Sequence, residues 1–105
     1  LGGEDEMPKT YAMGHIDLTN AEKFMADYGS KVEATITAFG GKFLVRGGEV
    51  SHQEGKPSDI NVILEFPDRA AATSWYESGQ YQAILSGRTD NSTNTYLAIV
   101  DGLSD

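Results

Sequence analysis

Two pairs of glycines enclose a short apolar segment at residues 40–48, Gly-Gly-Lys-Phe-Leu-Val-Arg-Gly-Gly. Because glycine adopts positive φ angles without a Cβ clash, these pairs predict a sharp turn at each end of a short strand. The strand carries one arginine, Arg46, and a guanidinium in an apolar run needs an anion, an aromatic ring or a wet pocket. The segment therefore predicts a strand whose arginine finds its partner elsewhere in the chain.

The pattern before this strand predicts another strand and then a long helix. Residues 9–18 alternate in part between apolar and polar, and Thr19 followed by Glu22 has the form of a capping box. Apolar residues then recur every three or four positions, which is typical of one helical stripe. We expect Gly29 to bend this helix and Gly40 to end it.

The second half of the chain repeats the same order of elements. Residues 60–66 are almost continuously apolar at their centre, which is typical of a strand covered on both faces. The other elements that we expect are a continuation of the second strand over residues 49–51, a polar loop over 52–58, a helix over 69–77 capped at Pro67-Asp68, a short helix over 80–85, an irregular segment over 86–94 and a last strand over 96–100.

Two β-α-β units with right-handed crossovers interleave into a ferredoxin-like βαββαβ fold of the α+β class. Its four-stranded antiparallel sheet carries both helices on one face. Since the central strands are apolar on both faces, the open face needs a partner, and we expect a homodimer that pairs sheet to sheet. We expect a single domain over residues 7–105, preceded at residues 1–6 by a cloning remnant or a disordered tail.

Composition excludes several classes of partner and site. The net charge is −8 and the basic residues form no cluster, so we expect neither nucleic-acid binding nor attachment to an anionic membrane. No run of about 18 apolar residues is present to span a bilayer. The chain has no cysteine, no leader-like opening, and no phosphate-loop or dinucleotide motif, so we expect a cytoplasmic protein without a bound cofactor.

Several short motifs occur together in this chain. They are residues 42–48, residues 65–67, residues 72–78 with Trp75-Tyr76, Tyr81-Gln82, Arg88 and residues 99–102. Together they resemble one known family, the small bacterial proteins grouped as domain of unknown function 1330 (DUF1330). The resemblance implies membership of the dimeric α/β-barrel proteins, ferredoxin-like chains that pair sheet to sheet and include cofactor-free monooxygenases, isomerases and haem-handling proteins. The chain departs from the family pattern at Gly79, where the family has proline, and at Asp101, where it has glutamate.

Arg46 is the first candidate for a functional residue. It could anchor the carboxylate of a small acid in the cleft between sheet and helices. Alternatively, it forms a structural ion pair with Glu65 or Asp101 on a neighbouring strand. In both cases the arginine is expected to lie against an anion.

Four other residues are weaker candidates. His15 could act as a general base beside the cleft, or it is a structural or dimer-contact histidine. Trp75 is expected in the core and is a candidate ligand contact, and the Tyr81 hydroxyl could line the mouth of a pocket. Arg88 could complete an anion site with Arg46 or bond the carbonyls at a helix C-terminus. The histidine spacing matches no metal-binding motif, so we expect no metal site.

These residues support two hypotheses of different classes. The first is a homodimer that binds a small carboxylated or aromatic molecule in the cleft between sheet and helices, including the case of a cofactor-free enzyme. The alternative is a non-catalytic dimeric module with a structural, stress or regulatory role. Fold alone does not choose between them.

Overall fold

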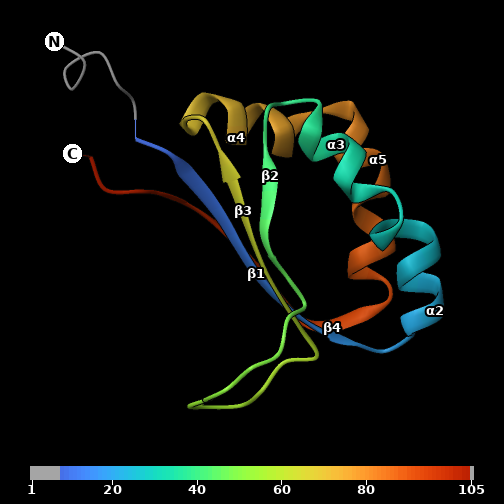
Figure 1. The fold of residues 1–105 in the computed structure, drawn as a ribbon. Coiled ribbons are helices and arrows are strands. Elements are labelled where there is room, and N and C mark those ends of the chain that lie inside the picture. Colours follow the sequence, from blue (N-terminus) through green and yellow to red (C-terminus); the bar gives the residue numbers. More distant parts are fainter. Residues whose placement is uncertain (1–7, 105) are drawn as a thin grey trace, which may run out of the picture.

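The computed structural model describes residues 8–104, so the N-terminal segment that we interpret as a remnant or tail lies outside the described residues. Four antiparallel strands form one sheet in the order β2-β3-β1-β4. This is the predicted ferredoxin-like topology, and that prediction is confirmed (Figure 1). The strands are β1 (Thr10–Leu18), β2 (Lys42–Arg46), β3 (Ile60–Phe66) and β4 (Ser92–Asp101).

The first crossover consists of three consecutive helical segments, α2 (Ala21–Phe24), the π-helix η1 (Met25–Gly29) and α3 (Val32–Thr37). The expected cap at Thr19 is wrong by one residue. Asn20 has the extended backbone of an N-cap, with φ of −147°, and its side-chain oxygen accepts a hydrogen bond from the Lys23 N–H at 3.0 Å. Asparagine caps a helix at least as well as threonine, so the position is physically reasonable.

The second crossover contains α4 (Arg69–Glu77) and α5 (Gly79–Thr89). As predicted, Asp68 caps α4, by accepting from the Ala71 N–H at 2.8 Å. Ser78 ends α4 and caps α5 by accepting from the Tyr81 N–H at 3.1 Å.

The predicted end of α5 is wrong. We expected a helix over 80–85 and an irregular segment over 86–94, but the helix continues to Thr89 and β4 begins at Ser92. The Asn91 amide donates to the Gly87 carbonyl at 2.9 Å and so satisfies one of the free carbonyls of the last turn. Of the helix residues that suggested a loop, Ser86 and Thr89 are exposed, whereas Gly87 and Arg88 are buried.

The connection between β2 and β3 also differs from the prediction. Residues 49–51 are not in a strand, and the chain from 47 to 59 leaves the sheet as a long projecting loop (Figure 1). Gly47, with φ of +85°, makes this departure possible. At the base of the loop, Asp59 accepts from the Leu18 N–H at 2.8 Å, and the Asp59 N–H donates to Asp17 at 3.2 Å.

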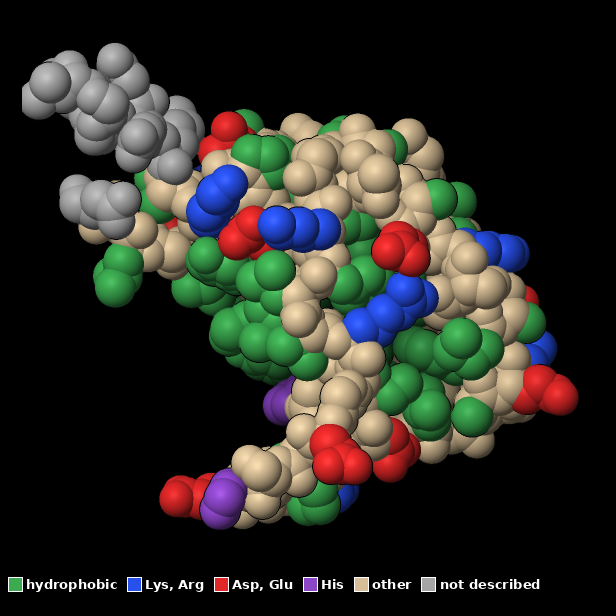
Figure 2. Space-filling model, in the orientation of Figure 1, with side chains coloured by type: hydrophobic (Ala, Val, Ile, Leu, Met, Phe, Trp, Pro, Cys, Tyr) green, Lys and Arg blue, Asp and Glu red, His purple; other side chains and the backbone are tan. Residues whose placement is uncertain are grey.

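The helices cover one face of the sheet, and the hydrophobic core lies between the two layers (Figure 1). The opposite face is not covered by any described segment, yet it carries hydrophobic side chains (Figure 2). None of the helices within residues 8–104 is long and apolar enough to cross a membrane. The large hydrophobic residues exposed on the open face and its edge are Met13, Leu44, Val45, Tyr96 and Val100.

Candidate functional site

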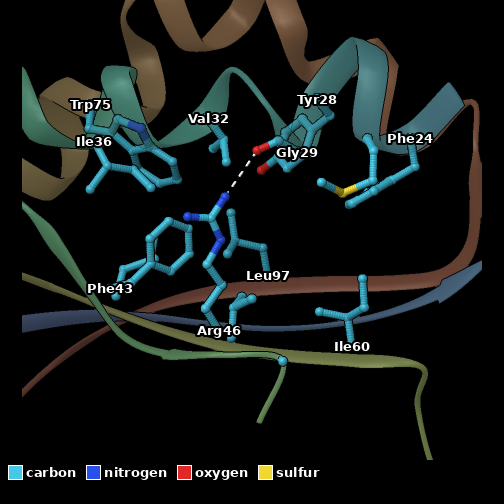
Figure 3. A pocket seen from close by; sticks show the side chains of 14 residues that line it. Phe24, Tyr28, Gly29, Val32, Ile36, Phe43, Arg46, Ile60, Trp75 and Leu97 are labelled. Atoms are coloured by element: carbon cyan, nitrogen blue, oxygen red, sulfur yellow. Dashed lines mark hydrogen bonds between the residues drawn. The ribbon is translucent and has the colours of Figure 1, made fainter. Parts of the chain in front are cut away.

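A cavity of about 180 Å³ lies between the sheet and the helices of the first crossover (Figure 3). Apolar side chains from both layers form most of its wall. Arg46 is the only charged residue among the described residues that line it. Prominent lining residues are Val62 and Leu64 from β3, Leu97 from β4, Val32 and Ile36 from α3, and Trp75 from α4.

An irregularity in β2 brings Arg46 to this cavity. One step along β3, from Leu64 to Ile63, corresponds to two steps along β2, from Phe43 to Val45. This extra residue is a β-bulge, which reverses the alternation of side chains beyond it. Arg46 therefore faces the helices, on the same side as Phe43, although regular alternation would put it on the opposite face.

The Arg46 guanidinium connects the edge strand to the helix layer. Its Nη1 donates to the Glu33 carboxylate at 3.0 Å and its Nη2 donates to the Gly29 carbonyl at 3.1 Å, the bond drawn in Figure 3. Its central carbon lies 4.5 Å from the centre of the Phe43 ring, a cation–π distance. Arg46 thus has both an anion and an aromatic partner.

The partners proposed for Arg46 in the ion-pair interpretation were wrong. Glu65 lies on the open face, where the Lys42 ammonium is 3.7 Å away. Asp101 is bound by Arg69, and the hydrogen bonds from this guanidinium hold the pKa of the Asp101 carboxyl below its usual range. The actual partner, Glu33, belongs to α3.

The helical segment opposite Arg46 is the π-helix η1. Its geometry appears in the bond from the Ser30 N–H to the Met25 carbonyl, five residues back, at 2.9 Å. Isolated π-helical turns within helices are frequent at functional sites. Here the π-turn ends at Gly29, and the carbonyl of Gly29 accepts the bond from Arg46.

Trp75 lies in the core, as expected, and its side chain also lines the cavity. Its side chain is 1% exposed, and its indole N–H donates to the Thr35 hydroxyl at 3.0 Å. Tyr81, by contrast, was expected at the mouth of a pocket and is fully buried. Its hydroxyl lies 2.9 Å from that of Tyr28, a residue that does line the cavity. Burial, reinforced by Tyr81, raises the pKa of Tyr28 above its usual value.

Arg88 does not share the cavity with Arg46. It is 7% exposed, donates to the Thr95 hydroxyl at 2.5 Å and lies 5.9 Å from the Tyr28 ring centre. Its Nε atom is buried without a hydrogen-bond partner among the described residues. The structure therefore places Arg88 behind the wall of the cavity.

His15 is on the other side of the sheet. It lies opposite Tyr96 in the pairing of β1 with β4, and the centres of the two rings are 4.7 Å apart on the open face. A base at this position has no access to the cavity. Among residues 8–104, no three histidine, aspartate or glutamate side chains gather where they could hold a metal ion.

Three residues of the site were not singled out from the sequence. Tyr28 belongs to the apolar helical stripe and Phe43 to the short strand, and neither position indicates more than a place in the core. Glu33 carried no signal, because an exposed glutamate on a helix is common. The Gly29 interruption was the one sequence feature that indicated irregular structure at this point.

Comparison with known proteins supports the fold and identifies the family. No protein of curated function matches the sequence. A protein of unknown function from Rhodopseudomonas palustris has a similar structure, with a TM-score of 0.73, 18% identity and coverage of 95% of this chain and 86% of that one. A dimeric ferredoxin-like protein of unknown function from Jannaschia sp. CCS1 has a TM-score of 0.71 and 8% identity, covering 90% and 99%.

A third similar structure belongs to a protein described as a cofactor-independent oxygenase, from Streptomyces nogalater. It has a TM-score of 0.60 and 8% identity, covering 93% of this chain and 96% of that one. At such identities the likeness establishes the shared fold only. The family model for the domain of unknown function DUF1330 matches residues 9–103, and the chain therefore belongs to the DUF1330 family.

Proposed function

We propose that this protein is a homodimer in which each subunit binds a small carboxylated or aromatic molecule in the cavity between sheet and helices. One observation carries the ligand part of the proposal, namely a hydrophobic cavity in which Arg46 is the only charged residue among the described lining residues. Binding sites for small molecules are typically apolar, with a few polar groups that fix the orientation of the ligand. Arg46 is suited to hold the carboxylate of such a ligand.

Replacing Arg46 by alanine is expected to weaken binding of a carboxylate ligand by about 1.5–3 kcal/mol, the range for hydrogen bonds to charged groups. Arg46→Lys should restore binding only in part, because lysine lacks the planar fork of donors. A panel of small aromatic and aliphatic acids, screened by thermal shift and then titrated calorimetrically, gives the measurement. Lys42→Ala is the matched control, since Lys42 is on the same strand and faces the other side of the sheet.

Equal affinity of the wild type and both Arg46 variants would show that Arg46 only links strand to helix. If no acid in the panel raises the melting temperature or gives a binding isotherm, the proposal of an acid-binding cavity fails.

The homodimer part of the proposal is supported by the open face of the sheet. Met13, Tyr96 and Val100 are each at least 40% exposed there in the single chain. Exposed hydrophobic patches of this kind commonly mark interfaces. The ferredoxin-like protein from Jannaschia sp. CCS1 is described as dimeric, which agrees with this assignment.

Light scattering of the purified protein at micromolar concentration is expected to give twice the chain mass of 11.3 kDa. Met13→Glu should convert the dimer to a monomer, because it buries a carboxylate at the centre of the sheet-to-sheet contact. Ser74→Glu, at an exposed position of α4, adds the same charge on the helix side and should leave the dimer intact. A wild-type protein with the mass of one chain would contradict this part of the proposal.

The proposal includes enzymatic activity without a cofactor as one form, and the fold shared with the Streptomyces nogalater oxygenase is compatible with it. The second candidate is a non-catalytic dimeric module. The shortage of titratable side chains favours it, since Tyr28 and Arg46 are the only ones among the described residues that line the cavity. Turnover of a ligand that the screen identifies would decide for the enzyme.

A further inference from the structure

We infer that the cavity selects single-ring anions, and that Glu33 is a built-in competitor which the carboxylate of such a ligand displaces from Arg46. This inference rests on the proposed function and specifies the ligand class and the control of the same site. It follows from the contacts of Arg46, from the exposure of its ion pair and from the size of the cavity.

The first step concerns the donors of Arg46. Both terminal nitrogens are engaged at the helix layer, Nη1 with Glu33 and Nη2 with the Gly29 carbonyl. A carboxylate binds a guanidinium best through two parallel N–H bonds in one plane. The guanidinium has five N–H groups, of which these bonds use two, so donors remain for a ligand. A carboxylate that pairs with the terminal nitrogens nevertheless lies next to the Glu33 carboxylate, and the like charge of Glu33 opposes its binding.

The second step is energetic. The side chains of Arg46 and Glu33 are 45% and 63% exposed, so their ion pair lies in water and is weak. A carboxylate that reaches Arg46 from the cavity has apolar side chains rather than water on its other sides. Charge pairs are stronger in such surroundings than in water. An anionic ligand can therefore replace Glu33, whereas a neutral ligand leaves the Arg46–Glu33 pair unchanged.

The third step limits the size and shape of the ligand. A cavity of about 150 Å³ in a protein interior accommodates one benzene molecule. The cavity here, of about 180 Å³, therefore has room for one ring. Phe43 and Trp75 contribute aromatic surfaces against which a flat ring can pack. Benzoate is thus the simplest probe that satisfies all three steps, and benzamide is its neutral counterpart of nearly the same shape.

The test titrates benzoate and benzamide into the wild-type protein and into Glu33→Gln. Glutamine keeps the shape of the side chain and removes its charge. Trp75 is the only tryptophan of the chain and lines the cavity, so its indole N–H signal in the NMR spectrum reports binding directly. Glu33→Gln removes the exposed ion pair between Arg46 and Glu33. This should tighten benzoate binding by roughly two- to fivefold and leave benzamide binding unchanged.

Glu77→Gln serves as the matched control, since it removes one exposed carboxylate from α4 that does not line the cavity. It should change neither affinity. Benzoate binding that is unaffected by Glu33→Gln, or benzamide binding as tight as benzoate binding, would overturn the inference while the proposed function stands. If no single-ring acid binds the wild type or Glu33→Gln, the inference fails, and the proposed function fails with it only if the wider panel of aromatic and aliphatic acids gives no binding either.

Discussion

Replacing Trp75 by alanine is expected to lower the free energy of unfolding by about 3–5 kcal/mol, the range for large aromatic residues removed from cores. Trp75 is 1% exposed, and the centre of its ring lies 4.3 Å from the ring centre of Tyr81 and 5.3 Å from that of Phe66. The substitution also leaves the Thr35 hydroxyl without the indole N–H that it accepts. This loss is a large part of the total free energy of unfolding of a small domain.

Urea unfolding followed by circular dichroism measures this loss, because the variant contains no tryptophan to follow by fluorescence. Trp75→Phe is the matched control, since it keeps a ring in the core and should cost clearly less. A denaturation midpoint for Trp75→Ala equal to that of the wild type would mean that Trp75 is not packed as the structure shows.

A methyl group added at Gly87 should also destabilise the protein. A Cβ at this position in α5 would lie 2.7 Å from the backbone carbonyl oxygen of Asp27 in η1. A clash with a backbone atom cannot be relieved by rotating a side chain, so α5 and η1 have to move apart. Overpacking of this kind typically costs about 1–3 kcal/mol, which exceeds the gain of up to about 1 kcal/mol from placing alanine in a helix.

Gly79→Ala provides the control for Gly87→Ala. Gly79 begins α5, and a Cβ there would meet no atom within 4 Å. Its unfolding free energy should therefore equal or slightly exceed that of the wild type. If both variants were equally stable, the close approach of α5 and η1 would not be a constraint on the fold.

Local signals were sufficient to predict most of the fold. Asp68 has the side chain of a helix cap and forms the expected bond, and Gly40 follows α3 with φ of +79°, as a helix stop requires. The order of these elements limited the topology to the ferredoxin-like sheet. The core role of Trp75 followed from its size in a small domain.

The parts of the site that were not predicted depend on contacts between distant residues. Tyr81 is buried because its hydroxyl meets that of Tyr28, 53 positions away, and no local pattern encodes that meeting. The partner of Arg46 was expected on a neighbouring strand, but Glu33 reaches it from the helix layer. That contact depends on the bulge in β2, which regular alternation does not predict.

The bulge in β2 also affects how the charge of the cavity can change among related proteins. If the extra residue of the strand were accommodated beyond Arg46 instead of before Val45, Val45 would face the cavity and Arg46 the open face of the sheet, with the sequence unchanged. An aligned arginine alone is therefore a poor guide to ligand class within a family. Because β2 is an edge strand with one neighbour, such a shift breaks few ladder bonds. The charge of the cavity could thus change through the position of one backbone irregularity rather than through substitution of a residue.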